Sequence, residues 1–295
     1  MALSIVIAHR PARQGRRSHW GTHSTEVVQL GPMDRSLLLA VNANNTLTKI
    51  GVYRRSDLLH HWRISSETGR TADELAVLLR SLFDSAGTRF DNVGGVAISS
   101  VVPALLDTLV RLARDYFHIT PLVAGPDTQT GMRVLYENPR DVGADRICAA
   151  VAAYAKYGGP AIAVDLGTAT TFSVVSREGD FLGGAIAPGI GISVDALAEH
   201  AAQLHRIPLE APRTAIGRST TAAMQAGIVF GFVGLVNDVV RRIREELGAP
   251  AVTVATGGWA DLVVPECTCI DHHDPLLVLE GLRLIYEQSR QATRR

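Results

Sequence analysis

The feature that most constrains the fold of this chain is an internal repeat. Residues 37–53 read LLLAVNANNTLTKIGVY, and residues 161–175 read AIAVDLGTATTFSVV. Each segment holds an apolar strand, an Asp or Asn, a turn that contains threonine, and a second strand. Asn42 and Asp165 occupy equivalent positions, 123 residues apart. Two halves that begin in the same way predict two related domains facing each other across a cleft.

Strand and helix patterns alternate around this repeat, which indicates an α/β fold. The capping box Thr71-Ala-Asp-Glu74 predicts a helix start, as do Pro103, the segment 143–146, and Ser219 or Thr220. We expect an N-terminal domain over residues 34–157 and a C-terminal domain over residues 158–295. The expected strands are 36–41, 49–54, 60–65, 93–99, 161–165, 171–176, 181–183 and 252–255.

The first 33 residues do not fit either domain. They combine a short apolar start with several arginines, whereas a secretory signal places its positive charge ahead of a longer apolar core. Met33 lies just before the first strand. We therefore expect residues 1–33 to be a disordered extension or the product of a start codon assigned too far upstream.

The composition limits the partners and the compartment. Basic and acidic residues balance at 29 each, which argues against nucleic acid as the main partner. The 3 cysteines in 295 residues do not form a disulfide framework and favour a reducing cytoplasm. The longest apolar run, residues 227–236, is too short to cross a membrane. We expect a cytoplasmic protein that binds neither nucleic acid nor membrane.

The second copy of the repeat, DLGTATT at residues 165–171, has the chemistry of a phosphate loop. Glycine lets the backbone approach a ligand, and threonine hydroxyls and backbone N–H groups bind phosphate oxygens. A carboxylate at the end of a strand can hold a hard cation, directly or through water. The alternative is a β-hairpin in which Asp165 and Gly167 only serve the turn.

The segment Gly143-Ala-Asp-Arg146 places an acid beside a base at a helix start. In one interpretation, Asp145 deprotonates a substrate hydroxyl and Arg146 binds an anion. In the other, Asp145 is only a favourable first-turn carboxylate and Arg146 is a solvated neighbour. The residues alone leave both interpretations open.

Taken together and in order, the motifs resemble those of type III pantothenate kinases, within the superfamily of acetate kinases, sugar kinases and actin-like ATPases. The resemblance covers nearly the whole chain from about Met33. Each motif is weak alone, and the ordered set is specific. The matching segments are HWRIS, ISSVVP, YENPRDVGADR, DLGTATTF, LGGAIAPGI, AMQAG, ATGG and LEGLRLIYE.

The resemblance implies two actin-like (ribonuclease H-like) domains flanking a nucleotide cleft, in a homodimer. It also implies phosphorylation of pantothenate by ATP with Mg²⁺, the first step of coenzyme A biosynthesis. Asp145 resembles the catalytic base, and Asp165 the ligand of a monovalent cation, K⁺ or NH₄⁺. The residues that resemble substrate contacts are Tyr136, Gly143, Ala144, Arg146 and Thr220. Those that resemble ATP contacts are Asn42, Ala43, Asn44, Asn45, Thr46, Leu47, Thr48, Lys49 and Thr168.

The first loop departs from the family pattern Asp-x-Gly-Asn-Thr, because it reads Asn42-Ala-Asn44-Asn45-Thr46. Asparagine tolerates the backbone conformations of glycine better than most residues. Asn42 matters more, because an amide brings no negative charge to Mg²⁺. We expect reduced MgATP affinity or rate. Two alternatives remain: a relative without turnover that acts as a binding or regulatory protein, and a kinase for another small hydroxylated molecule.

Overall fold

A computed structural model describes residues 35–125 and 128–293, so the expectation for residues 1–33 lies outside the described part. The first half forms a sheet in the order β3-β2-β1-β4-β5, and the second forms one in the order β10-β9-β6-β7-β8. When the second order is reversed to β8-β7-β6-β9-β10, each strand takes the same place as its counterpart in the first sheet. In both halves the first three strands are antiparallel neighbours and the last two run parallel to the first. The predicted duplication is confirmed.

The elements follow the predicted alternation closely. The first half contains β1 (Leu37–Ala43), β2 (Leu47–Arg54), β3 (Asp57–Ser65), α1 (Ala72–Ser85), η1 (Phe90–Asn92), β4 (Val93–Ser100), α2 (Pro103–Phe117), β5 (Leu122–Val123), η2 (Pro139–Asp141) and α3 (Ala144–Tyr157). The second contains β6 (Ala161–Leu166), β7 (Ala169–Val175), β8 (Phe181–Pro188), α4 (Ile190–His200), α5 (Thr220–Leu247), β9 (Val252–Thr256), α6 (Ala260–Val263), η3 (Val264–Glu266), β10 (His272–His273) and α7 (Leu277–Thr293).

The helix starts agree with the local signals in the sequence. Thr71 accepts a hydrogen bond from the backbone N–H of Glu74, whose carboxylate accepts one from the Thr71 N–H, so the capping box is complete. Pro103 occupies the first turn of α2, and Ser219 caps α5. The elements β5, β10, α4 and α6 were not predicted.

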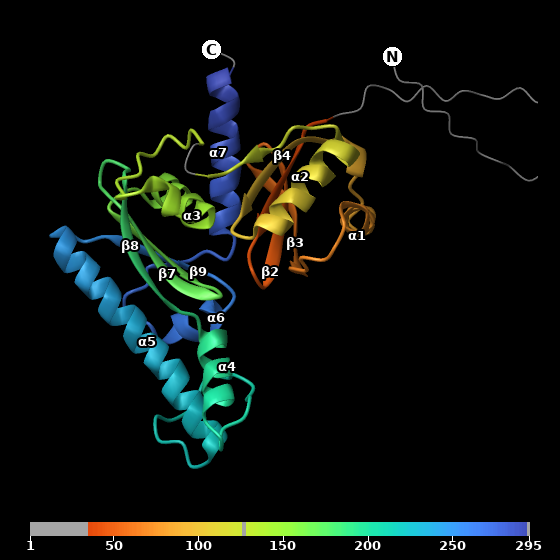
Figure 1. The fold of residues 1–295 in the computed structure, drawn as a ribbon. Helices are drawn as coiled ribbons and strands as arrows, with labels where there is room; N and C mark the ends of the chain where they lie inside the picture. Colours follow the sequence, from red (N-terminus) through yellow and green to blue (C-terminus); the bar gives the residue numbers. More distant parts are fainter. Residues whose placement is uncertain (1–34, 126–127, 294–295) are drawn as a thin grey trace, which may run out of the picture.

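Two helices lie between the sheets (Figure 1). Helix α3, from the first half of the sequence, packs on β6 and β7 of the second sheet. Helix α7, from the end of the chain, packs on β1, β2 and β4 of the first sheet, and the two helices pack on each other. The strands of the first sheet lie within residues 37–123 and those of the second within residues 161–273, while α3 and α7 each pack on the sheet of the other half. The division into domains at residues 157 and 158 stays a prediction.

Alternation along the central strands fixes which side chains face these helices. Leu38 and Ala40 of β1 belong to the core around α3 and α7, whereas Leu37, Leu39 and Val41 belong to the core under α1 and α2. In the same way, Ala161 and Ala163 of β6 face α3 and α7, and Ile162 and Val164 face the core under α5. By this alternation Asn42 and Asp165 lie on the inner faces of the two sheets.

Helix α5 runs along the outside of the second half (Figure 1). Its 28 residues are long and apolar enough to span a membrane by length and composition, and 33% of that window is buried in the protein. Core helices of soluble proteins pass the same test, and α5 contributes Phe232, Val236 and Val240 to the core against the second sheet. The expectation that the protein binds no membrane therefore stays a prediction.

Candidate functional site at the junction of the two halves

The turns after β1 and β6 meet at the junction of the two halves. The hydroxyls of Thr46 and Thr168 share a hydrogen bond of 3.1 Å. Each turn is closed by one backbone hydrogen bond, from the Asn44 N–H to the Leu47 carbonyl and from the Gly167 N–H to the Ala169 carbonyl. The two predicted phosphate loops are therefore brought into direct contact.

The substitution at Asn44 is accommodated without strain. Among the described non-glycine residues, positive φ occurs at Arg55 and His118, so Asn44 does not use the left-handed region. The backbone here does not require the special freedom of glycine. The altered chemistry of the first loop therefore rests on Asn42.

Asp145 lies in the first turn of α3, where a side-chain oxygen accepts a hydrogen bond of 2.8 Å from the Arg146 backbone N–H. Burial raises the pKa of Asp145, and the Arg146 N–H and charge oppose this shift. The charge of Asp145 also raises the pKa of Asp165. Two carboxylates from different halves thus act on each other at the junction.

Asp165, near the end of β6, has the more strongly shifted carboxyl. Burial raises its pKa to about 6, the nearby Lys49 ammonium lowers it, and the Asp145 carboxylate raises it further. Lys49 comes from β2 in the first half, and its ammonium donates a hydrogen bond to the Pro275 carbonyl just before α7. The junction therefore collects an ammonium and two carboxylates.

Replacing Asp165 with asparagine is expected to stabilise the ligand-free protein at neutral pH. Its folded-state pKa of about 6 lies above the ordinary 3.8, so folding favours the protonated form and stability falls as the pH rises through that interval. The amide removes this loss, worth about 1–3 kcal/mol above pH 7. Thermal unfolding between pH 4 and 8 should give curves that diverge as the pH rises, with exposed Asp107→Asn as the control. Parallel curves would contradict the prediction.

Several buried polar atoms at these strand ends have no hydrogen-bond partner among the described residues. They are both side-chain polar atoms of Asn42, the Asn44 Oδ1, and the hydroxyls of Ser99, Thr170 and Thr256. Ser99 is the register partner of Asn42, and Thr256 that of Asp165. Buried polar groups normally find partners, so these atoms indicate a place for polar ligand groups or water.

Ser99 and Thr256 were not among the predicted site residues, although both lie in segments that carried the resemblance. Their positions in the sequence could have indicated a role in the site. Both lie at or near the carboxyl ends of strands that run parallel to the central strand of their sheet, where α/β proteins place ligands.

Tyr136 and Arg146 line the same part of β8. A Cβ built at Gly183 would lie 3.4 Å from the Tyr136 ring, and the Arg146 guanidinium lies over the Phe181 ring. Arg146 is 6% exposed, and its guanidinium donates to the Phe172 carbonyl and the Ser173 hydroxyl, each at 3.3 Å. The interpretation of Arg146 as a solvated neighbour is therefore wrong, because this side chain joins α3 to β7.

Some predicted site residues lie apart from this group. The Thr48 hydroxyl shares a hydrogen bond of 2.8 Å with the Ser66 hydroxyl, and Leu47 is an exposed residue at the start of β2. Thr220, at the start of α5, lines a hollow of about 830 Å³ with Leu197 and Met224. Helix α4 begins beside the second loop, since a Cβ built at Gly189 would lie 2.1 Å from the Thr168 carbonyl oxygen, and its 11 residues span roughly 16 Å. Of the remaining predicted residues, Ala43 ends β1 and Asn45 lies in the turn after it, while Gly143 precedes α3 and Ala144 begins it.

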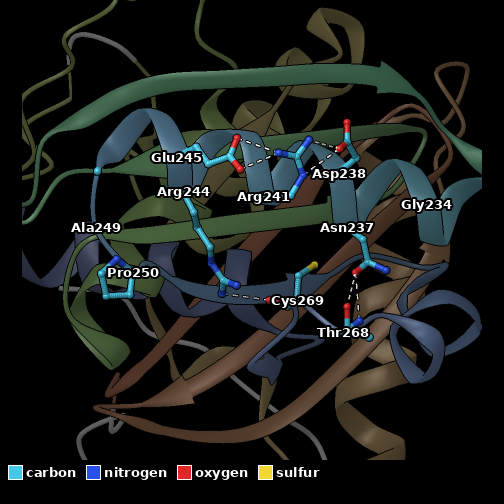
Figure 2. Close-up of a pocket in the computed structure, with 11 residues that line it drawn as sticks. Gly234, Asn237, Asp238, Arg241, Arg244, Glu245, Ala249, Pro250, Thr268 and Cys269 are labelled. Atoms are coloured by element: carbon cyan, nitrogen blue, oxygen red, sulfur yellow. Dashed lines mark hydrogen bonds and ion pairs between the residues drawn. The ribbon is translucent and has the colours of Figure 1, made fainter.

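Another hollow, of about 760 Å³, lies beside the C-terminal part of α5 (Figure 2). Its charges are paired internally: Arg241 bonds to both Asp238 and Glu245, and Arg244 donates to the Cys269 carbonyl at 3.2 Å. None of the predicted site residues lines it. No group of three or more His, Cys, Asp and Glu in the described ranges could hold a metal ion.

Two duplicated halves, each with a strand–turn–strand loop at a shared junction, define an actin-like fold of the kind found in sugar kinases. The family model for type III pantothenate kinase matches residues 38–242. The type III pantothenate kinase of Moorella thermoacetica is 49% identical over 253 residues, covering 86% of this chain and 100% of that protein. The one from Acidothermus cellulolyticus is 48% identical over 254 residues, covering 86% and 99%. The chain belongs to the type III pantothenate kinase family.

Solved structures extend the likeness in fold. A conserved putative Baf family transcriptional activator from Campylobacter jejuni has a TM-score of 0.56 at 16% identity, covering 86% of this chain and 99% of that one. Lmo2764 from Listeria monocytogenes, a putative N-acetylmannosamine kinase, has a TM-score of 0.52 at 11% identity, covering 86% and 99%. At these identities the likeness establishes the fold alone.

Proposed function

We propose that this protein transfers the terminal phosphoryl group of ATP to the hydroxyl of pantothenate, the first step of coenzyme A biosynthesis. The observation that carries the proposal is the junction itself. It brings Asp145 and Asp165 from different halves close enough for the charge of one to shift the pKa of the other. Membership of the family supplies the substrates.

Asp145 is the proposed base. As the substrate oxygen forms its bond to phosphorus, the bond between phosphorus and the leaving ADP oxygen breaks, and the hydroxyl proton passes to Asp145. A half-buried carboxyl with a raised pKa accepts a proton more readily than a solvated one. Tyr136, Gly143 and Ala144 are the proposed substrate contacts around it. Arg146 is proposed to stabilise this side of the site from the protein interior, because its guanidinium donates a hydrogen bond to the backbone of β7.

The loop residues Asn42–Lys49 and Thr168 are proposed to hold ATP with Mg²⁺, which would neutralise charge on the phosphates when bound. The unpartnered polar atoms of Asn42, Asn44 and Ser99 fit a ligand rich in polar atoms. Asp165 is the proposed ligand of a monovalent cation, K⁺ or NH₄⁺. The unpartnered Thr256 hydroxyl, on the neighbouring strand in register with Asp165, offers it a second oxygen.

We also propose a homodimer that uses the exposed face of α5. Ala223, Gly227, Gly231 and Gly234 lie on this face, and a Cβ added at any of the three glycines meets nothing within 4 Å. Small residues allow a second helix to approach closely. Thr220 lies in the hollow at the start of the same helix, so it would reach a substrate site only if a second copy brought it there.

Arginine at Gly231 is expected to convert the dimer to a monomer, because its long charged side chain would separate the two surfaces. Sedimentation velocity checks this, with Gly69→Arg as the control at another exposed glycine that has open space. A dimer that survives Gly231→Arg would place the interface elsewhere, and a monomeric parent protein would sink the dimer proposal.

The function is tested by incubating the purified protein with pantothenate, MgATP and a potassium salt. Phosphorylated pantothenate and ADP should form in equal amounts. No product at high enzyme concentration would overturn the proposal. A second candidate, a binding or regulatory relative without turnover, rests on Asn42, and it predicts nucleotide binding without product. The cytoplasmic location and the absence of nucleic-acid or membrane partners stay predictions.

A further inference from the structure

Asn42 and Lys49 stand directly opposite each other on β1 and β2. They are register partners, so their side chains project from the same face of the sheet. In the second half the residue opposite Asp165 is Thr171. The duplicated position thus carries an amide and an ammonium in the first half, and a carboxylate and a hydroxyl in the second. The loss of the carboxylate at residue 42 coincides with a cation across the strand pair.

The Lys49 ammonium is not neutralised by a contact. It donates to the Pro275 carbonyl at 3.3 Å, and no carboxylate in the described ranges forms an ion pair with it. The charged groups that act on it are Asp165 from β6, Arg63 from β3 and Asp274 before α7, and Asp274 is already paired with Lys156. Burial lowers the pKa of Lys49, so an approaching anion would stabilise its charge.

Asn42 is buried, at 1% exposure, yet neither its amide nitrogen nor its oxygen has a partner among the described residues. Ser99, its register partner on β4, has an unpartnered hydroxyl as well. An amide nitrogen donates hydrogen bonds to phosphate oxygens, which a carboxylate at this position would repel. Two independent observations, an unneutralised ammonium and orphaned donors, therefore meet at one strand end.

We propose that Asn42 and Lys49 form a phosphate-binding pair that holds the triphosphate of the nucleotide directly, so that binding depends less on Mg²⁺. The proposal rests on the proposed function and concerns the nucleotide side of that site. Lys49 supplies positive charge within the protein, and the neutral amide at residue 42 leaves that charge available. An aspartate at residue 42 would stand opposite Lys49 and pair with it.

The test is calorimetric binding of ATP to the full chain, once with excess EDTA and once with Mg²⁺, in the absence of pantothenate. The parent protein should bind ATP in EDTA with a Kd within about tenfold of the Mg²⁺ value. Lys49→Met should weaken binding in EDTA by about 10- to 100-fold, because a charge-assisted contact is lost. Lys49→Arg should restore much of it, and Arg54→Met, an exposed cation at the end of the same strand, should change nothing.

The pairing is tested by a double-mutant cycle. Asn42→Asp alone should weaken binding in EDTA, because the new carboxylate neutralises Lys49. In the Lys49→Met background the same change should cost less in EDTA than it does in the parent protein, because no ammonium is left to neutralise. The remaining loss reflects the missing amide donor and the repulsion of phosphate, and Mg²⁺-dependent binding should become stronger. Thermal unfolding of each variant without nucleotide separates these effects from loss of fold.

Strictly Mg²⁺-dependent binding by the parent protein would overturn the proposal, as would unchanged EDTA binding by folded Lys49→Met. These outcomes are distinct from failure of the proposed function. Binding in EDTA without any product from pantothenate would sink the kinase and leave the phosphate-binding pair in place. Product formation with no binding in EDTA would do the reverse.

Discussion

Asparagine at Asp145 is expected to abolish pantothenate-dependent ADP formation while ATP still binds. The amide cannot accept the hydroxyl proton, and removal of a general base costs about 10²- to 10⁴-fold in rate. The substitution is nearly isosteric, and the amide oxygen can still accept the hydrogen bond from the Arg146 N–H. Loss of kcat with little change in nucleotide affinity is therefore the expected pattern, measured by a coupled ADP assay and by calorimetry.

Asp141→Asn is the matched control, since this exposed carboxylate lies just before the same helix. It should retain the parent rate. If Asp145→Asn kept more than about a tenth of the parent kcat, Asp145 would not be the base. A parallel loss of rate and of thermal stability would instead point to a structural role.

Alanine at Gly281 is expected to destabilise the protein, with a large loss of activity at assay temperature. A Cβ built there would lie 1.8 Å from the Cys148 carbonyl oxygen, where α7 crosses α3. Alanine normally stabilises an exposed helix by up to about 1 kcal/mol relative to glycine. Here the clash must separate the two helices, at a cost of about 1–3 kcal/mol or more. Since α3 carries Asp145 in its first turn, this separation would also displace the proposed base.

Chemical denaturation of Gly281→Ala and of Gly191→Ala checks this. A Cβ at Gly191, in α4, meets Trp259 at an ordinary 3.6 Å, so that variant should match the parent or exceed it slightly. Equal stability of the two variants would show that the crossing of α3 and α7 can relax without cost.

The duplicated fold could be predicted because its signal is local and occurs twice. An apolar strand that ends in Asp or Asn, a threonine turn and a second strand depend on residues close in sequence. The edge strands β5 and β10 could not be predicted, because two residues give no periodicity and only pairing with a neighbour defines them. The packing of α3 and α7 across the sheets involves contacts between distant parts of the chain, which no local pattern encodes.

The site was partly predictable for the same reason. Asp145, Asp165 and the two loops lie in motifs, and the structure brings them to one junction. The burial of Arg146 against β7 was not predictable, because an arginine at a helix start is usually solvated. The relation between Asn42 and Lys49 required the register of β1 and β2. A seven-residue separation through a turn does not reveal that they face each other.

The exchange of α3 and α7 between the sheets has a consequence for synthesis on the ribosome. Leu38 and Ala40 of the first strand are covered on their inner side by the core around the last helix. That helix is made about 240 residues later, and at 5–20 residues per second the delay is roughly 10–50 seconds. During this interval the inner face of the first sheet lacks its cover, and a nascent chain stopped before Leu277 would expose it permanently. The N-terminal half is therefore a poor candidate for an independently folding fragment, and its completion depends on release of the whole chain.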